Sequence, residues 1–294
     1  MKKVLVLGGT RFFGQKLVER LLEENHDVTI VTRGNSENPF GDTVEHIQVD
    51  RKDTEAFKQA VVGRNFDVVY DNICYSPNEA KQFCTIFNGS IGKLVFTSTL
   101  STYEANGQPH AEADFDPYTY GIMMGEASQF TYGEGKRLAE AVFYKFAQFP
   151  VVAVRFPIVM GEDDYTRRLH FHVERIINGE PIGFVNTDAE MGFIQATEAA
   201  RFLAWVGMNE VEGPINAAAN GIISLKALIA LIEEKTEKRA KIALLGTDEI
   251  RSPYAVPASW YMTTEKAQQA GFTFSKLNEW LPSLVEEVAK SSAK

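Results

Sequence analysis

The sequence predicts a doubly wound α/β fold, in which a mostly parallel sheet lies between layers of helices. Short apolar runs alternate with helix-like stretches through the first half of the chain, starting with a run at residues 3–7 that ends at Gly8 and Gly9. Such alternation implies right-handed crossover connections between parallel strands. After residue 160 the predicted pieces become shorter and mostly helical, which predicts a smaller C-terminal part that covers a substrate.

Local patterns predict the individual elements. Apolar runs bounded by turn residues indicate strands, and apolar residues spaced three and four apart indicate helices. The predicted strands cover residues 3–7, 28–32, 44–49, 68–70, 93–98 and 151–156. Helices are predicted around residues 17–22 and 56–61, and over 78–87, 132–146, 171–178, 197–206, 224–236 and 277–289. Residues 104–131 are rich in Gly, Pro, Asp and Tyr and predict a long loop, and long loops in compact domains are usually functional.

Composition narrows the classes of function. The chain has 294 residues, of which 45% are hydrophobic and 23% are charged, as is usual for globular proteins. Its net charge of -9 argues against a nucleic-acid partner, and its apolar runs are too short for a membrane span. The two cysteines, Cys74 and Cys84, lack the spacing of a metal or redox motif and indicate a reducing, cytoplasmic compartment. A small-molecule ligand is therefore expected.

A glycine-rich turn follows the first strand and opens the first helix, which is the position of a Rossmann-type dinucleotide site. Its first glycine permits a tight turn, its last permits close helix packing, and the free N–H groups of the helix bind pyrophosphate. The predicted cofactor contacts in this turn are Gly8, Thr10, Arg11, Phe12, Phe13 and Gly14. The alternative is a plain turn from strand to helix. We therefore divide the chain into a dinucleotide-binding domain, residues 1–160, and a mainly substrate-binding part, residues 161–294.

Two residues at strand ends bear on the choice between NAD and NADP. The second strand ends at Arg33, where an NAD-selective protein would carry an acid for the ribose hydroxyls. A guanidinium there, with Arg11 in support, suits the 2′-phosphate of NADP, so NADP is favoured over NAD. Asp50 ends the third strand and is placed to accept a hydrogen bond from the adenine amino group. The alternatives are a solvated Arg33 and an Asp50 that only forms a turn.

Tyr132 and Lys136 lie four residues apart, and so on one face of the predicted helix. A nearby ammonium favours the phenolate form of a tyrosine, which can then exchange a proton with a substrate hydroxyl or carbonyl. Upstream, residues 97–103 carry several hydroxyls just after the fifth strand, where ligands of such sheets bind. A strand end whose hydroxyls bond their own backbone is the alternative.

These motifs resemble the extended short-chain dehydrogenase/reductase superfamily, specifically its NAD-dependent epimerase/dehydratase group. The resemblance rests on the glycine turn, Asp50, residues 97–103, the Tyr132 and Lys136 pair, and residues 155–161, and it continues at 179–182, 192–194 and 213–216. It implies that Thr99, with Ser98 as the fallback, orients the substrate, that Tyr132 is the acid/base, and that Lys136 binds the nicotinamide ribose and lowers the pKa of the phenol. It also implies a nucleotide-sugar substrate and a homodimer formed through the Tyr132 helix and its neighbour.

Some positions depart from the usual pattern of this group. Arg11 stands in place of the middle glycine, and the fourth strand ends Asp71-Asn72-Ile73-Cys74, where sugar epimerases carry His-Leu-Ala-Ala. These departures resemble atypical members, which include chloroplast stem-loop RNA-binding and isoflavone-reductase-like proteins. Two functions of different classes are therefore expected. The first is an NAD(P)-dependent oxidoreductase or epimerase/dehydratase, and the second is a non-catalytic NADP(H) sensor or an RNA- or protein-binding module.

Two other groups of side chains have the chemistry of ligands. His170, His172 and Glu174 have metal-binding chemistry, but residues two apart on a helix point in different directions, so no metal site is predicted. Arg167 and Arg168 are placed either to bind an anionic group of the substrate or to start a helix in solvent.

Overall fold

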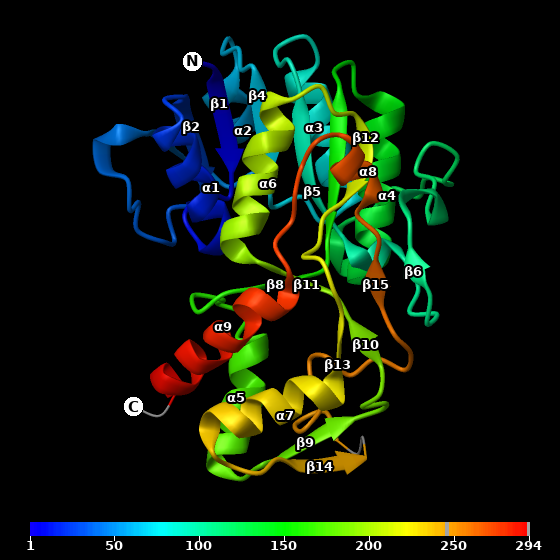
Figure 1. Cartoon of the computed structure of the whole chain (residues 1–294). Helices are drawn as coiled ribbons and strands as arrows, with labels where there is room; N and C mark the ends of the chain where they lie inside the picture. Colours follow the sequence, from blue (N-terminus) through cyan, green and yellow to red (C-terminus); the bar gives the residue numbers. More distant parts are fainter. Residues whose placement is uncertain (245–246, 293–294) are drawn as a thin grey trace.

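The computed structural model describes residues 1–244 and 247–292, and it confirms the predicted doubly wound fold (Figure 1). A seven-stranded sheet forms the upper half, and every neighbouring pair of its strands is parallel. Its strands, in sheet order, are β3 (Glu45–Gln48), β2 (Asp27–Thr32), β1 (Lys3–Leu7), β4 (Val68–Asp71), β5 (Leu94–Thr99), β7 (Val151–Phe156) and β12 (Gly213–Asn216). The chain reverses its direction of progress between β1 and β4, which is where such sheets bind ligands.

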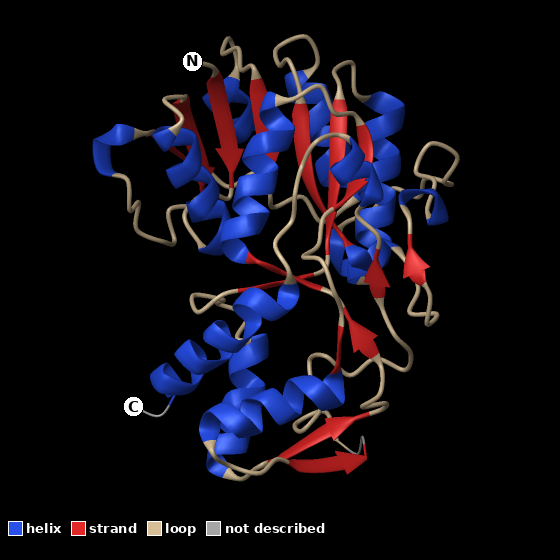
Figure 2. Cartoon of the chain, viewed as in Figure 1, coloured by secondary structure: helices blue, strands red, loops and turns tan. Residues whose placement is uncertain are grey.

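Alternation along the strands explains the two helical layers. Val4 and Val6 of β1 point into one core, and Leu5 and Leu7 point into the other, because successive strand residues face opposite sides. One face is covered by α1 (Phe12–Glu23) and α6 (Ala196–Met208), and the other by α2 (Thr54–Val61), α3 (Pro77–Phe87) and α4 (Tyr132–Phe146) (Figure 2). The buried strands read as continuous apolar runs because both of their faces are covered.

The lower half has a core of its own. It packs α5 (Arg168–Asn178), α7 (Leu225–Thr236) and α9 (Leu277–Ser292) over β9 (Pro181–Phe184), which pairs with β14 (Lys241–Leu244) (Figure 1). The other strands are β6 (Pro109–His110), β8 (Ile158–Met160), β10 (Glu190–Met191), β11 (Phe193–Gln195), β13 (Ile223–Ser224) and β15 (Tyr261–Met262), and the other α-helix is α8 (Glu265–Gln269). Short 3-10 helices cover Gly41–Thr43, Leu100–Thr102, Glu112–Asp114 and Ala127–Gln129. Among the described residues no helix is long and apolar enough to cross a membrane.

The chain crosses between the two halves several times. Helix α6 and strand β12 follow residue 160, yet both pack on the upper sheet. The structure therefore does not divide into two halves at residue 160. The division into a dinucleotide-binding domain and a substrate-binding part stays a proposal about function.

Residues 104–131, the predicted long loop, lie across the outer side of α4. Within this segment the ring of Tyr118 lies 4.6 Å from that of Tyr144 on α4, measured between centroids. The Tyr120 hydroxyl donates to the Glu134 carboxylate, at 2.9 and 3.0 Å. The loop is thus anchored on the helix that begins with Tyr132.

Candidate active site

Two clefts meet where the sheet reverses direction. The first, of about 480 Å³, extends from the end of β2 to the glycine turn, and the second, of about 390 Å³, extends from that turn to the start of α4. Five residues line both clefts: Phe12, Phe13, Asn72, Tyr75 and Tyr165. The clefts therefore form one continuous groove along the carboxyl ends of the strands.

The glycine turn is shaped for a phosphate. Gly8 adopts a left-handed conformation with φ +83°, and a Cβ on Gly14 would lie only 2.3 Å from the carbonyl oxygen of Gly8. Arg11 precedes α1 without a side-chain cap, so the first N–H groups of that helix face the cleft without a side-chain acceptor. These are the features that bind pyrophosphate, so the residues fit a dinucleotide. Phe12 also adopts a left-handed conformation, with φ +52°, a strained geometry that is often found at ligand sites.

At the other end of the first cleft lie the residues predicted to contact the adenosine. Arg33 and Asp50 both line this cleft, together with Asn35 and Ser36. One Asp50 oxygen accepts the backbone N–H of Lys52 at 2.9 Å, which is the turn-forming role. The other oxygen has no protein donor among the described residues. The structure thus brings Arg33 and Asp50 to one cleft with Thr10 and Arg11.

Tyr132 is the first residue of α4 and is 55% exposed in the second cleft. The Thr131 side chain accepts the N–H of Glu134 and fixes the start of the helix. Two glycines allow this first turn to approach its neighbours. A Cβ on Gly133 would lie 2.3 Å from the carbonyl oxygen of Ser101, and a Cβ on Gly135 would lie 2.5 Å from that of Tyr75.

Lys136 is 1% exposed, and its Nζ donates to the carbonyl oxygen of Thr97 at 2.7 Å. The Thr97 hydroxyl donates to the Asn72 side-chain oxygen at 2.7 Å, and the Asn72 amide donates to the carbonyl oxygen of Gly8 at 3.4 Å. A chain of hydrogen bonds therefore connects the phosphate turn with the lysine of the acid/base pair.

The two candidate hydroxyls have different partners. Ser98 donates to the Glu140 carboxylate, so its proton is already used. Thr99 accepts the N–H of Ser101 at 3.1 Å, and its hydroxyl lies 3.3 Å from that of Ser101. Both Thr99 and Ser101 line the second cleft, which leaves Thr99 as the proposed substrate-orienting residue and adds Ser101 beside it.

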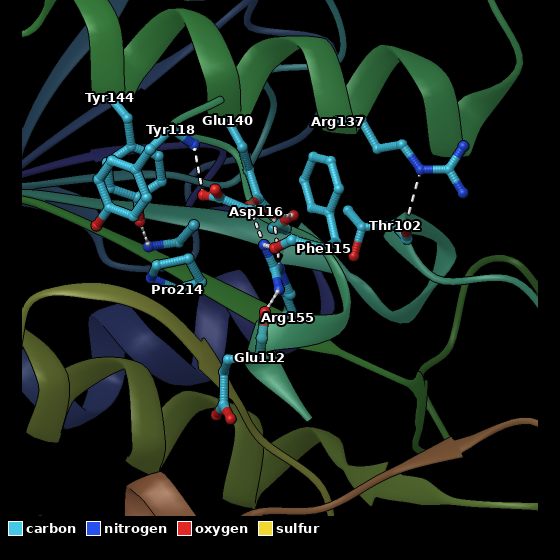
Figure 3. Close-up of polar contacts among 12 residues, drawn as sticks. Thr102, Glu112, Phe115, Asp116, Tyr118, Arg137, Glu140, Tyr144, Arg155 and Pro214 are labelled. Carbon is cyan, nitrogen blue, oxygen red and sulfur yellow. Dashed lines mark hydrogen bonds and ion pairs between the residues drawn. The ribbon is translucent and has the colours of Figure 1, made fainter. Parts of the chain in front are cut away.

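A buried ion pair supports this end of the groove. Arg155 on β7 and Glu140 on α4 have fully buried side chains, and Arg155 donates to both carboxylate oxygens, at 3.1 and 2.6 Å. Figure 3 shows the same guanidinium close to Glu112 and Phe115, whose carbonyl oxygens it reaches at 3.0 and 3.1 Å. The pair therefore joins the sheet, the Tyr132 helix and the 104–131 loop beneath Ser98.

The opposite wall of the second cleft comes from the lower half. Thr166, Arg168, Met191, Pro253 and Trp260 line it. Arg168 begins α5, and within residues 1–244 and 247–292 its guanidinium has neither an ion-pair nor a hydrogen-bond partner. The titratable side chains of this cleft are tyrosines, Lys136 and Arg168, without a carboxylate. Its charge is therefore positive, although the chain as a whole is acidic.

His172, one of the two histidines with metal-binding chemistry, has structural contacts. His172 is fully buried, its Nε2 lies 2.7 Å from the Ser252 hydroxyl, and its Nδ1 lies 2.8 Å from the carbonyl oxygen of Arg168. Burial lowers the pKa of His172 to about 4. Burial also raises the pKa of the Cys74 thiol, which makes it a poor nucleophile. No metal-binding cluster of His, Cys, Asp or Glu occurs in the part of the chain that the structure describes.

Sequence reasoning did not select three residues that the groove brings together, namely Asn72, Tyr75 and Tyr165. Asn72 and Tyr75 follow β4, whose departure from the usual motif was the only signal in the sequence. Tyr165 lies on the segment after β8, and its ring lies under the Arg11 guanidinium, at 5.5 Å from the centroid. Only the tertiary fold brings that segment to the glycine turn.

The fold is of the Rossmann type, and the groove has the features of a dinucleotide site. Residues 4–82 match the NAD dependent epimerase/dehydratase family, which confirms the resemblance inferred from the sequence. The chain is 33% identical to the chloroplast stem-loop binding protein of 41 kDa b of Arabidopsis thaliana, over 38% of this chain and 33% of that protein. It is 25% identical to UDP-glucuronic acid decarboxylase 1 of Danio rerio, over 60% of this chain and 45% of that protein. The matches thus span less than half of either relative.

Solved structures agree with this fold over the whole chain. The dTDP-glucose 4,6-dehydratase of Bacillus anthracis, in complex with NAD, superimposes with a TM-score of 0.77 at 17% identity, covering 100% of this chain and 98% of that one. The UDP-N-acetylglucosamine 4-epimerase of Bacillus cereus gives a TM-score of 0.72 at 18% identity, covering 99% and 96%. Identities this low establish the fold alone.

Proposed function

We propose that this chain is an NAD(P)-dependent enzyme, an oxidoreductase or epimerase/dehydratase, that acts on a hydroxyl or carbonyl group of a small polar substrate. The observation that carries the proposal is the continuous groove, which joins a phosphate-binding turn to a tyrosine and lysine pair through five shared residues. The family match and the name of the Danio rerio relative support the same class of reaction.

Each residue of the second cleft has a proposed role. A bound nicotinamide would supply the hydride acceptor or donor. The Tyr132 Oη takes or returns the proton of the substrate oxygen, and the Thr99 hydroxyl orients that oxygen. Lys136 binds the nicotinamide ribose and places a positive charge close to Tyr132, with Nζ 5.9 Å from the centroid of its ring.

NADP is the favoured cofactor. The adenosine end of the groove presents Arg33 with Asn35 and Ser36, and β2 ends without a carboxylate that would bond the ribose hydroxyls. A guanidinium and short polar side chains suit the 2′-phosphate. The solved neighbours named above include an NAD complex, so NAD is the alternative cofactor.

A nucleotide sugar is the proposed substrate class. Arg168 faces the second cleft with no partner among the described residues, and the cleft has no carboxylate lining, so an anionic group is expected to bind there. A diphosphate meets that requirement. By name, the Danio rerio relative acts on UDP-glucuronic acid and the Bacillus anthracis neighbour acts on dTDP-glucose, which supports the same choice.

The test is a fluorescence titration of the wild type, Arg33→Ala and Tyr132→Phe with NADPH and NADH, followed by a turnover screen with nucleotide sugars. Arg33→Ala should weaken NADPH binding by about tenfold or more and leave NADH binding unchanged. Tyr132→Phe should bind NADPH normally and lose turnover by about 10²–10⁴-fold. If the wild type binds neither nucleotide, the proposal is wrong.

The name of the Arabidopsis relative favours one second candidate, an RNA-binding module that uses the same fold without turnover. The net charge of -9 argues against it, because phosphate backbones bind to clustered Lys and Arg. Tight binding of a stem-loop RNA by a wild type that shows no turnover would favour this candidate.

A cytoplasmic location and a homodimer stay predictions. The buried free thiols of Cys74 and Cys84 support a reducing compartment.

A further inference from the structure

Tyr75 lies beside the buried lysine, and its main chain is fixed on both sides. Its backbone N–H donates to the Glu79 carboxylate at 2.6 Å. Its carbonyl oxygen packs against Gly135, where a Cβ would lie 2.5 Å away. The residue therefore stands at a defined distance from the first turn of α4, and its ring lines both halves of the groove.

The ammonium of Lys136 has an unusual environment. It is 1% exposed and has three N–H donors, but Thr97 provides its only hydrogen-bond acceptor among residues 1–244 and 247–292. The Nζ atom lies 4.7 Å from the ring centroid of Tyr75 and 4.7 Å from that of Phe96. Aromatic faces attract cations, and the attraction is strongest where water is excluded. The rings of Tyr75 and Phe96 thus stabilise the ammonium where further hydrogen-bond acceptors are lacking among the described residues.

The rings of Phe96 and Tyr75 differ in their exposure to solvent. Phe96 is fully buried within the sheet, so it separates Lys136 from the core. Tyr75 is 39% exposed and lines the second cleft together with Lys136. The phenol of Tyr132 lies further away, with its ring centroid 5.9 Å from Nζ. Of these two tyrosines, Tyr75 therefore has the ring that lies closer to the ammonium.

We propose that Tyr75 is a positioning residue, whose ring face holds the Lys136 ammonium against Thr97 and keeps it dry beside Tyr132. The proposal rests on the function proposed above for Tyr132 and Lys136, and it adds a residue outside the motif that identified them. Burial raises the pKa of Tyr75, so its phenol stays protonated at neutral pH and does not replace Tyr132 as the base. The ring is what acts, and the hydroxyl is dispensable for this role.

The test compares Tyr75→Leu with Tyr75→Phe, which keeps the ring. Lys136 is labelled with acetic anhydride in the cofactor-free protein, and its acetylation rate is measured by mass spectrometry relative to exposed Lys276. The rate should rise about tenfold in Tyr75→Leu and change by less than about twofold in Tyr75→Phe, because the aromatic face persists in the latter. Val62→Ala, which truncates a 67% exposed side chain that lines neither cleft, should leave the rate unchanged. Thermal melting confirms that each variant is folded.

Equal labelling rates in the wild type and Tyr75→Leu would overturn the proposal, as would equal increases in Tyr75→Phe and Tyr75→Leu. Turnover gives a second readout. It should fall in Tyr75→Leu, because a less ordered ammonium no longer stands in place beside Tyr132, and Tyr75→Phe should restore it. If the wild type binds no nucleotide, the proposed function fails, but the labelling experiment still decides the role of Tyr75.

Discussion

The phosphate end and the acid/base end of the groove are built in different ways. The phosphate end comes from one stretch of chain, Gly8 to Gly14, and uses backbone N–H groups and glycine geometry. The acid/base end collects side chains from β4, β5, α4 and the lower half. It is held together by the buried pair of Arg155 and Glu140. A site formed by one continuous segment needs only the right residues in that segment. A site formed by several distant segments also depends on the packing that brings them together.

The largest effect on this comparison should come from Glu140→Ala. Its removal leaves the Arg155 guanidinium buried without a counter-charge, which typically costs about 3–5 kcal/mol of folding free energy. Urea unfolding measures the loss. Binding of adenosine 2′,5′-bisphosphate, which requires only the first cleft, should persist in the protein that remains folded, while Ser98 loses its acceptor.

The matched control is Glu104→Ala, which removes an ion pair with Arg137 from a glutamate that is 82% exposed. Exposed pairs contribute little, so its stability should stay close to that of the wild type. If Glu140→Ala were no more harmful than Glu104→Ala, the buried pair would not be what supports the acid/base end.

Two glycine variants should separate the ends of the groove. In Gly14→Ala the new Cβ would lie 2.3 Å from the carbonyl oxygen of Gly8, and in Gly135→Ala it would lie 2.5 Å from that of Tyr75. Overpacking of this kind costs roughly 1–3 kcal/mol, which corresponds to about tenfold in affinity at the site that is displaced. Gly14→Ala should therefore weaken the binding of both adenosine 2′,5′-bisphosphate and NADPH.

Gly135→Ala should leave the bisphosphate affinity unchanged and reduce NADPH affinity and turnover. Gly121→Ala is the control, because its Cβ would meet no atom within 4 Å. Isothermal calorimetry with the two ligands distinguishes the outcomes. Equal loss of bisphosphate binding in Gly14→Ala and Gly135→Ala would show that the two ends do not act separately.

The same contrast explains what the sequence could predict about the fold. Strands such as β1 and β5 are apolar runs with turn residues after them, so local patterns were enough to predict them. Strand β12 was not predicted as a strand, because it has four residues, includes Pro214 and lies at the edge of the sheet. Residues 213–216 form a strand because they pair with β7, which is distant in sequence. Hence α6 and β12 return to the upper sheet where the sequence predicted a separate part.

The candidate site follows the same rule. Spacing along one helix suggested Tyr132 and Lys136, and the structure brings them to one cleft with Thr99. Tyr75 and Tyr165 were not predicted, because neither belongs to a motif and each meets the groove only through tertiary packing. The sequence does not decide the role of Arg168, because its context is equally typical of an anion ligand and of a helix start in solvent.

The smallest effect concerns the pH dependence of stability in the lower half, where α5 presents Arg168 to the groove. Burial lowers the pKa of His172 to about 4 from an ordinary value of 6.5. Between these values the unfolded chain binds a proton that the folded protein excludes, so stability is full above pH 6.5 and falls as the pH drops toward 4. The free energy of unfolding should decrease by about 2 kcal/mol between pH 7.5 and pH 5 from this residue alone.

Urea unfolding at a series of pH values measures this slope, and His172→Phe should flatten it. The ring of the variant can still stack on Tyr254, whose centroid lies 4.5 Å from that of His172. His26→Asn, which removes a partly buried histidine from the upper half, should flatten the slope less, because burial lowers the pKa of His26 without excluding solvent from it. If both variants changed the slope equally, the loss of stability in acid would not be specific to the lower half of the molecule.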